Sequence, residues 1–343
     1  KDEESEIHEI SIRGRGNSSW TSMPKKSYKL EFAAKQSLLG MPQNKDWALI
    51  ANYADKTLMK NYLVYNVAKQ IKSFYSPRCK FVELYLNQDF LGTYLLVETI
   101  KSGKNRVSFS ETTDAYIIEA DSKLKSGEQY FVSDVLEEDD KVFKIHEPHN
   151  ASDFMIEQVS NHIHEFESYL TNIEANVDNQ LGDWIDVDDM IKYMWIQEFT
   201  KNPDVNFYTS VFFCWEKNDV IKMGPVWDFD LAFGGHYKES VSLPFDWRCV
   251  GYWYEYMLKD CEFVNQRKRF WVENKLYFES IVDSVDVVYD MLKESADNNF
   301  RRWNVLESTE NKFHPKSYRS YRDAVDDLKV WIKERLAWID ANL

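Results

Sequence analysis

Apolar residues alternate with polar ones in the first part of the chain and change to a helical spacing after Asp153. Tyr28, Leu30 and Phe32 alternate with polar neighbours, as in a half-buried strand. From Phe263 onward, Trp, Tyr and Leu recur at the spacing of amphipathic helices. Strands followed by helices, rather than alternating with them, indicate an α+β fold with a small β-rich N-lobe and a larger, mainly helical C-lobe.

The pattern predicts about five strands and one helix in the N-lobe. The strands are expected at residues 7–14, 25–32, 46–52, 80–86 and 91–98. A helix is expected over residues 56–71, with Asp55 as its N-cap. Further strands are expected at 115–120 and 141–146, and a helix at 188–199 with Asp186 or Asp188 as its cap. We therefore assign residues 1–102 to the N-lobe and residues 103–343 to the C-lobe.

The net charge of −15 is distributed unevenly along the 343 residues. Residues 10–106 contain sixteen Lys or Arg and six Asp or Glu, an excess of ten positive charges, and the acidic excess lies outside them. Nucleic-acid binding requires a basic surface, so the acidic chain argues against a nucleic-acid partner. A basic N-terminal region beside an acidic remainder suits a polyanionic ligand on one wall of a site and a metal on the other. A solvated basic face is the alternative.

Targeting and redox signals are few. No apolar stretch approaches the ~20 residues that a membrane-spanning helix needs, so no membrane span is expected. The chain does not begin with Met, and we expect that a segment precedes it. Its four cysteines lack CxxC spacing, which argues against a zinc cluster or a redox pair.

A glycine-containing loop, "IRGRGNSSW", occupies residues 12–20. Gly14 and Gly16 let the backbone approach a ligand closely, and their N–H groups can point at phosphate oxygens. Arg13 and Arg15 can supply charge-assisted hydrogen bonds to the same phosphates. The loop therefore predicts a phosphate site, and a hairpin turn with exposed arginines is the alternative.

A cluster of lysines follows in "PKKSYKLEF", residues 24–32. A lysine on a strand after a glycine-rich loop can reach phosphates, as it does in kinase folds. Alternation places Lys26 on the same face as Tyr28 and Leu30, so we expect Lys26 to point inward and Lys29 to lie on the opposite face. Both are candidate phosphate contacts, and ordinary surface lysines are the alternative.

Two acidic loops carry the remaining candidates. In "TKNPDVNFYTSVFF", residues 200–213, Asp204 and Asn206 lie between a helix that Pro203 prevents from continuing and an aromatic strand. In kinases, an Asp in such a loop accepts the proton of the substrate hydroxyl and an Asn binds metal. An Asx turn is the alternative.

The second acidic loop, "KMGPVWDFDLAFGG" at residues 222–235, carries an apolar run into Asp228 and Asp230 and then turns on two glycines. Carboxylates between aromatic residues are unfavourable unless a cation compensates them, and Mg²⁺ is the usual one. Kinases present their metal-binding Asp at the end of a short strand in this way. The 24 residues between Asp204 and Asp228 are enough for a hairpin that brings the two together.

Taken together, these motifs resemble the spore-coat protein H (CotH) kinase family. The resemblance rests on "IRGRGNSSW", "PKKSYKLEF", "LLGMPQNKDWALIANYADKTLMKNYL", "FLGTYLLVETIK" and "GPVWDFDLAFGG", in that order, over roughly residues 8–240. It implies an atypical protein-kinase-like fold that binds ATP and Mg²⁺ or Mn²⁺ and phosphorylates Ser or Thr hydroxyls of protein substrates. It also implies an extracytoplasmic location, secreted or at the surface of a cell or spore.

The resemblance assigns roles by position. Asp204 matches the family's catalytic aspartate, Asp228 its metal-binding aspartate, and Lys26 its nucleotide-contacting lysine. Thr209 stands where an Asn is expected five residues beyond the catalytic Asp. The second metal contact is therefore expected from Asn206, Ser210 or Asp230, a departure that puts strong activity in doubt but not metal binding.

Two alternatives to a protein kinase stay open. A degenerate kinase-like scaffold acting in surface adhesion or as a structural binding protein would use its many aromatic side chains to stack on sugars. Such a scaffold predicts no metal-dependent stabilisation by ATP, whereas a kinase predicts a clear one. The other alternative keeps nucleotide chemistry but transfers a phosphoryl or nucleotidyl group to a sugar or small molecule.

Overall fold

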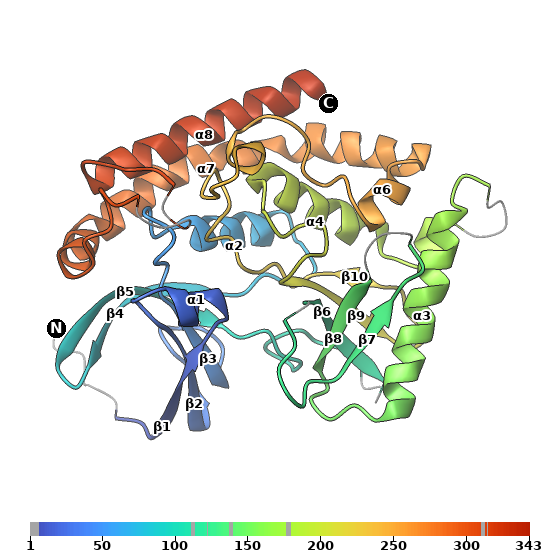
Figure 1. Ribbon diagram of the computed structural model, residues 1–343, viewed down its shortest axis with the longest axis horizontal. Coiled ribbons are helices and arrows are strands. Elements are labelled where there is room, and N and C mark those ends of the chain that lie inside the picture. The colour runs from blue at the N-terminus through green and yellow to red at the C-terminus, as the bar shows by residue number, and fades with distance from the viewer. Residues whose placement is uncertain are drawn as a thin grey trace.

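A computed structural model describes residues 7–110, 114–121, 123–136, 140–175, 180–309, 313 and 315–343. Its strands form two five-stranded antiparallel sheets, and long helices lie across both (Figure 1). Strands therefore dominate the first part of the described chain and helices the last part. This arrangement confirms the α+β class.

The first sheet belongs to the N-lobe and has the strand order β1-β2-β3-β5-β4. Its strands are β1 (Ile10–Arg15), β2 (Ser27–Gln36), β3 (Asn44–Ile50), β4 (Cys79–Leu86) and β5 (Asp89–Glu98). All five were predicted within a few residues. Leu30, Trp47 and Tyr94 are buried together on one face of this sheet and form a small core.

Two helices accompany the first sheet. The short helix α1 (Ser18–Ser22) interrupts the connection between β1 and β2. Helix α2 (Lys60–Gln70) begins later than expected, because Asp55 organises a turn between itself and the helix and still binds the N–H group of the first helical residue. The Asp55 carboxylate accepts hydrogen bonds from the backbone N–H groups of Thr57 at 2.8 Å and Lys60 at 2.9 Å.

The second sheet has the order β10-β9-β6-β8-β7 and lies within the residues assigned to the C-lobe. Its strands are β6 (Ala115–Ala120), β7 (Tyr130–Ser133), β8 (Lys141–Glu147), β9 (Val211–Glu216) and β10 (Lys222–Met223). The structure adds β7, which the pattern did not predict. It also ends the strand expected through residues 222–227 at Met223, because Pro225 has no N–H to continue the ladder.

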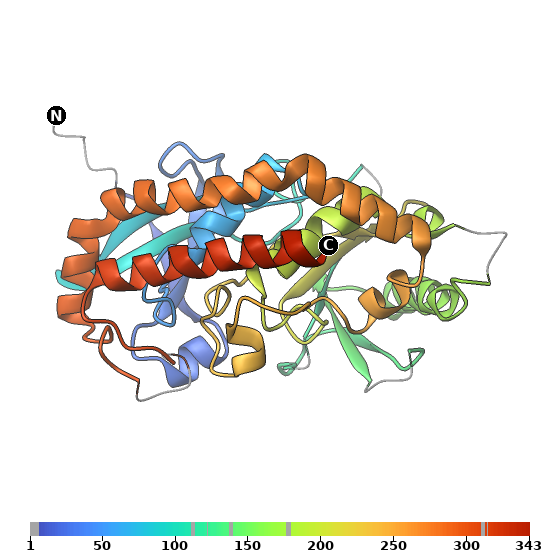
Figure 2. The same cartoon turned by 90° about the horizontal axis from the view of Figure 1, so that it is seen from above.

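Helices cover both sheets on one side, and two of them run along the length of the molecule (Figure 2). The helical elements of this part are α3 (Asp153–Thr171), a 3-10 turn at Leu181–Asp183, α4 (Val187–Thr200), α5 (Glu239–Ser242), α6 (Trp253–Met257), α7 (Cys261–Arg302) and α8 (Tyr321–Asn342). Asp186 caps α4, as one of the two predicted candidates, by accepting a hydrogen bond from Asp189 N at 3.0 Å.

Helix α7 joins the two lobes, because it packs against β5 and α2 of the first and α4 and α8 of the second. A buried lysine, Lys25, reinforces this contact. Its ammonium group donates to the carbonyl oxygen of Ala51 at 2.7 Å, to that of Thr93, and to Asn299 Oδ1 of α7 at 2.8 Å. The division of the chain at residue 102 remains a prediction.

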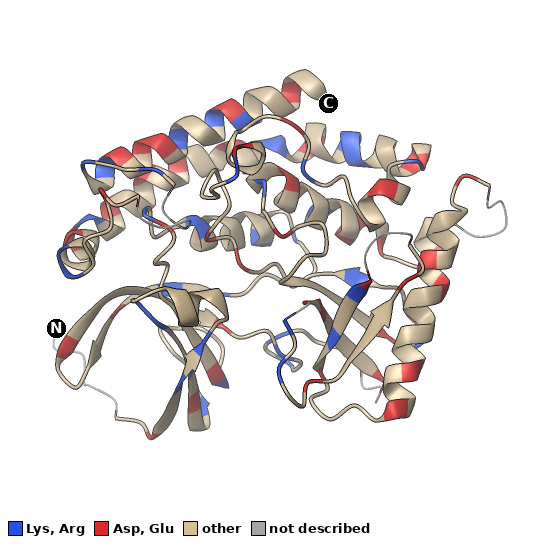
Figure 3. Cartoon of the chain, in the orientation of Figure 1, with Lys and Arg blue, Asp and Glu red and all other residues tan. Residues whose placement is uncertain are grey.

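Acidic and basic side chains are interspersed along the long helices and on both sheets (Figure 3). Among the described residues, none of the helices is apolar over a length sufficient to cross a bilayer.

Candidate active site

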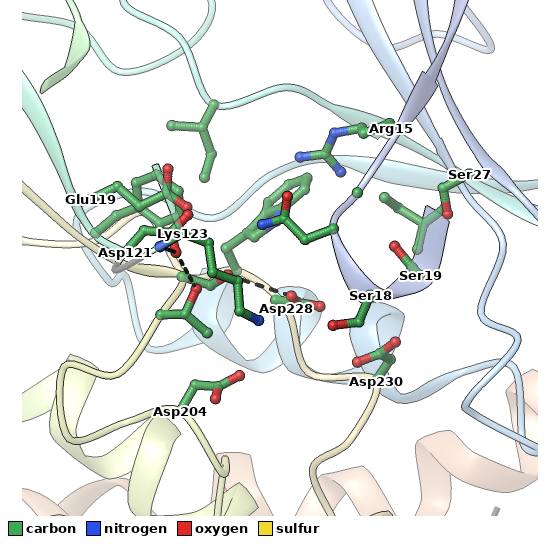
Figure 4. A pocket seen from close by; sticks show the side chains of 18 of the residues that line it. Arg15, Ser18, Ser19, Ser27, Glu119, Asp121, Lys123, Asp204, Asp228 and Asp230 are labelled. Carbon is green, nitrogen blue, oxygen red and sulfur yellow. Dashed lines mark hydrogen bonds between the residues drawn. The ribbon is translucent and has the colours of Figure 1, made fainter. Parts of the chain in front are cut away.

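A cavity of about 1070 Å³ lies between the two sheets and is lined by residues of both. Gly14 of β1, Asp204 of the loop after α4 and Asp228 of the loop after β10 all face it, so the three predicted segments do meet. The predicted residues that line the cavity are Arg13, Gly14, Arg15, Gly16, Lys29, Asp204, Asn206, Asp228 and Asp230. Figure 4 shows the centre of this cavity.

The two glycines are required by the way α1 folds back on β1. A Cβ at Gly14 would lie 2.3 Å from the Trp20 ring. Gly16 has a φ of +104°, and its Cβ would lie 1.9 Å from Ser19 Oγ. The glycines therefore let a short helix pack beside the loop, and they leave the loop backbone on the cavity wall.

Arg15 is the cation of this loop that reaches furthest toward the acidic residues. Its guanidinium group lies over the Trp227 ring, 4.6 Å from the ring centroid. Burial lowers the pKa of Arg15, while the carboxylates of Asp228 and Glu119 oppose that shift. Within the described residues it makes no side-chain hydrogen bond, so its donors are available to a ligand in the cavity.

Of the two predicted lysines, Lys29 lies within β2 and faces the cavity, whereas Lys26 lies one residue before the strand and does not. Lys26 packs over the Trp20 ring and donates to the Trp20 carbonyl oxygen, and it does not line the cavity. Its expected inward position in the site is therefore wrong, because the face that Lys26 shares with Tyr28 packs against Trp20. Lys29 does line the cavity, where it forms an ion pair with Asp46 at 2.7 Å.

Asn202 joins the two acidic loops. Its Oδ1 accepts a hydrogen bond from Asp204 N at 3.2 Å, and its Nδ2 donates to the carbonyl oxygen of Asp228 at 3.3 Å. The position of Asn202 is set by the end of α4, where Lys201 adopts a left-handed conformation (φ 46°) and Pro203 prevents the helix from continuing. Asp204 is thus held at a fixed place relative to Asp228.

Asp228 has a φ of 64°, which is unusual for a residue with a side chain. Its neighbours hold this conformation: Phe229 N donates to Asn61 Oδ1 at 2.8 Å, and Trp227 stacks on Tyr65 at a centroid distance of 6.1 Å. Strained backbone of this kind gathers at functional sites, where the surroundings maintain it. The strain turns the Asp228 carboxylate into the cavity (Figure 4).

The two glycines after the acidic turn make room for close packing. Lys60 of α2 donates to the carbonyl oxygen of Ala232 at 2.7 Å, and a Cβ at Gly235 would lie 2.4 Å from its Nζ. Gly234 has a φ of +73°, and its Cβ would lie 2.8 Å from Trp331 Nε1 of α8. The pair therefore lets the turn pack against both α2 and α8.

Burial raises the pKa values of all three carboxylates, and the charge of Asp228 adds to the shift at Asp204 and Asp230. Burial, and then the charge of Asp228, raises the pKa of Asp204 to about 7. The Asp228 carboxylate faces the cavity, whose walls surround it. This burial raises the pKa of Asp228, and the charge of Arg15 opposes the shift. Burial and Asp228 raise the pKa of Asp230 well above its usual value, against Lys60. A bound cation would relieve this repulsion.

The described residues contain no group of three or more His, Cys, Asp or Glu side chains arranged to hold a metal ion by themselves. Mg²⁺ in nucleotide sites is usually bound through one or two carboxylates together with phosphates and water, so Asp228 and Asp230 fit that mode. Asn206 lines the cavity, but its Oδ1 accepts a hydrogen bond from Gly251 N at 3.3 Å. Its metal-binding role stays a prediction.

A comparison with protein families finds that the model of the CotH kinase proteins matches residues 12–339, nearly the whole chain. The chain belongs to the CotH kinase family. No curated protein matches it. Membership confirms the resemblance that the motifs indicated and supports a kinase-like enzyme.

In this CotH kinase family member, the second sheet contributes a group that sequence reasoning missed. Glu119 and Asp121 lie at the end of β6, where Asp121 accepts a hydrogen bond from Thr209 Oγ1 at 3.1 Å. Lys123 follows them and extends between Asp204 and Asp228 (Figure 4). A signal was present, because "AYIIEAD" is an apolar strand ending in carboxylates, like the stretch before Asp228.

Proposed function

We propose that this protein is a kinase that uses ATP with Mg²⁺ or Mn²⁺ to phosphorylate Ser or Thr residues of extracytoplasmic or surface proteins. The observation that carries the proposal is that the Gly14–Gly16 loop and the carboxylates of Asp204, Asp228 and Asp230 line one cavity. Family membership supports the reaction class. The acceptor and the location rest on the family resemblance.

In the proposed reaction, Asp204 orients the acceptor hydroxyl and takes its proton. The hydroxyl oxygen forms a bond to the γ-phosphorus as the bond from that phosphorus to the bridging oxygen breaks, and ADP leaves with the electron pair. A pKa of about 7 makes the Asp204 carboxylate a better proton acceptor at neutral pH than an ordinary aspartate. Asp228, with Asp230 beside it, would hold the metal, which would supply positive charge against the phosphoryl group.

The remaining residues of the cavity place the phosphates. Arg15 lines the cavity with no hydrogen-bond partner for its side chain among the described residues, and Lys123 extends between Asp204 and Asp228 (Figure 4). The backbone of Gly14 and Gly16 approaches the ligand from the same wall, with Arg13 nearby. Positioned cations of this kind stabilise the charge of the transferred group, which is the main source of catalysis in phosphoryl transfer. Lys26 has no part in this arrangement.

The test is incubation with γ-labelled ATP and Mn²⁺, followed by mass spectrometry of the protein and of candidate acceptors. We expect label on Ser or Thr in the wild type and none in Asp228→Ala, with both proteins equally folded by circular dichroism. Asp290→Ala, an exposed aspartate of α7, is the matched control and should label normally. Turnover by Asp228→Ala at the wild-type rate would end the kinase proposal.

A catalytically weak scaffold for surface adhesion or structural binding is the second candidate. It is favoured by one observation: Asn206, the nearest amide to Asp204 along the loop after it, bonds to Gly251 N. A site with a weaker second metal contact would bind nucleotide poorly, if at all. An absence of metal-dependent ATP binding would support this candidate.

A further inference from the structure

The backbone immediately before Asp204 is held by an arginine from a distant loop. Arg248 Nε donates to the carbonyl oxygen of Asn202 at 3.3 Å, and its Nη2 donates to that of Pro203. These carbonyls follow the last turn of α4, where backbone acceptors have no partner within the helix. A cationic side chain is a favourable partner for them at a helix C-terminus.

Arg248 is itself fixed in place by a buried carboxylate. Glu198 of α4 accepts hydrogen bonds from Arg248 N at 2.8 and 3.0 Å and from Cys249 N at 2.8 Å. The Glu198 side chain is fully buried and forms an ion pair with Arg335 of α8, which is also fully buried. The backbone of the loop that carries Arg248 therefore cannot move without breaking hydrogen bonds to a buried carboxylate.

Arg335 fixes the same loop at a second place. Its Nη1 donates to the carbonyl oxygens of Pro244 at 3.1 Å and Asp246 at 2.9 Å. Its Nη2 also donates to the carbonyl oxygen of Glu198 at 2.8 Å. One arginine of the last helix thus ties together the end of α4 and residues 244–249.

We propose that Arg248 is a positioning residue for Asp204: its guanidinium group holds the Asn202–Pro203 backbone so that Asp204 faces the acceptor. Holding Asn202 also preserves its two hydrogen bonds to Asp204 N and the Asp228 carbonyl oxygen, and hence the placement of one loop against the other. This inference rests on the proposed function, because it assigns a role in the same reaction.

The geometry allows the side chain to be tested without removing its support. Glu198 binds the backbone N–H of Arg248, so substitution of the side chain leaves that contact in place. Arg248 is partly exposed on the cavity wall, which limits the expected loss of stability. Arg301 is an exposed cation of α7 outside this cavity and provides a matched control for loss of one guanidinium group.

The experiment compares Arg248→Gln, Arg248→Lys and Arg301→Gln with the wild type in steady-state phosphate transfer. For Arg248→Gln we expect kcat to fall by about 10- to 100-fold, because a small misplacement of a reacting group has an effect of this size. The apparent KM for ATP should stay within about twofold of wild type. Arg248→Lys should recover part of the lost kcat, since an ammonium group can still bind one carbonyl, and Arg301→Gln should change little.

Two results would overturn the inference. One is an Arg248→Gln variant with kcat close to that of an active wild type. The other is a raised KM with unchanged kcat, which would make Arg248 a ligand-binding residue. A wild type without transfer activity would instead overturn the proposed function. In that case a crystal structure of Arg248→Gln decides the inference: displacement of the Asp204 loop supports it, and an unchanged loop contradicts it.

Discussion

The two walls of the cavity are built differently. The glycine wall is open: Arg13, Gly14 and Gly16 are exposed, and within the described residues Arg15 has no hydrogen-bond partner for its side chain. The acidic wall is braced by hydrogen bonds to its loop backbone: Asn202 and Arg248 donate to backbone carbonyl oxygens, and Asn61 accepts from Phe229 N. The difference indicates that the acidic wall is arranged before a ligand arrives, whereas the glycine wall is completed by one.

We expect Asp204→Asn to separate the roles of the two walls most clearly, because it should affect transfer and not nucleotide binding. The amide keeps the shape of the side chain but cannot take a proton, so kcat should fall by about 100- to 10,000-fold. Nucleotide binding should persist, because the phosphate contacts proposed here come from other residues. Single-turnover transfer and ATP titration on the same preparation measure both effects. Loss of ATP binding with transfer intact would reverse the roles of the two walls.

On the glycine wall, Arg15→Gln should act mainly on binding. Hydrogen bonds to charged groups contribute about 1.5–3 kcal/mol, which corresponds to a rise in the KM for ATP of about 10- to 100-fold. The matched control is Arg301→Gln on the exposed end of α7, which should leave KM unchanged. If Arg15→Gln lowered kcat alone, the account of an open, ligand-completed wall would be wrong.

Within the acidic wall, Asn202→Ala should loosen the connection between its two loops. The variant leaves Asp204 N and the Asp228 carbonyl oxygen without the partner that each has in the structure. We expect kcat to fall by about 10-fold, and the free energy of unfolding to fall by about 1–3 kcal/mol. Urea unfolding and initial rates test this. Unchanged rates would show that the two hydrogen bonds of Asn202 do not set the position of Asp204.

The smallest expected effect concerns a contact between α3 and the second sheet that does not line the cavity. His162 of α3 stacks on Trp215 at 4.3 Å, and burial lowers its pKa to about 4. Because an unfolded histidine has a pKa near 6.5, the unfolded state binds more protons between pH 6.5 and 4. The stability that depends on neutral His162 is therefore complete above pH 6.5 and is lost as the pH falls toward 4.

Replacement of His162 by Phe should remove this pH dependence. At pH 5 the free energy of unfolding lost by the wild type through His162 should be about 1–2 kcal/mol, because the side chain is only partly buried. Hydrogen exchange at pH 7 and pH 5 provides the measurement. In the wild type, amides of β6 and β9 should lose protection before those of β3 and β5. Equal loss in both sheets would show that His162 does not distinguish them.

The sequence predicted the strands of the first sheet and the meeting of the three loops because both depend on local patterns. Alternation located the first sheet, and Asp204 and Asp228 were expected to meet because a hairpin of the intervening length brings its ends together. Gly14 and Gly16 marked a loop whose backbone needs room. In each case the signal lies within a short stretch of residues.

The supporting contacts could not be predicted in this way, because they join residues far apart in the chain. Arg248 reaches a carbonyl 46 residues away, and Lys25 binds Asn299 across 274 residues. The placement of Lys26 failed for a related reason. Alternation defines two faces of a strand, but only the tertiary contact with Trp20 determines which face borders the cavity.

The central claim is that the open basic wall and the braced acidic wall together bind a metal–nucleotide complex. The most direct measurement is the thermal unfolding midpoint with ATP, with and without Mn²⁺, for the wild type and for Asp228→Ala. The account predicts a rise in Tm for the wild type that requires both ATP and Mn²⁺ and is absent in the variant. A wild type whose Tm does not respond to ATP with Mn²⁺ would contradict it and favour a scaffold.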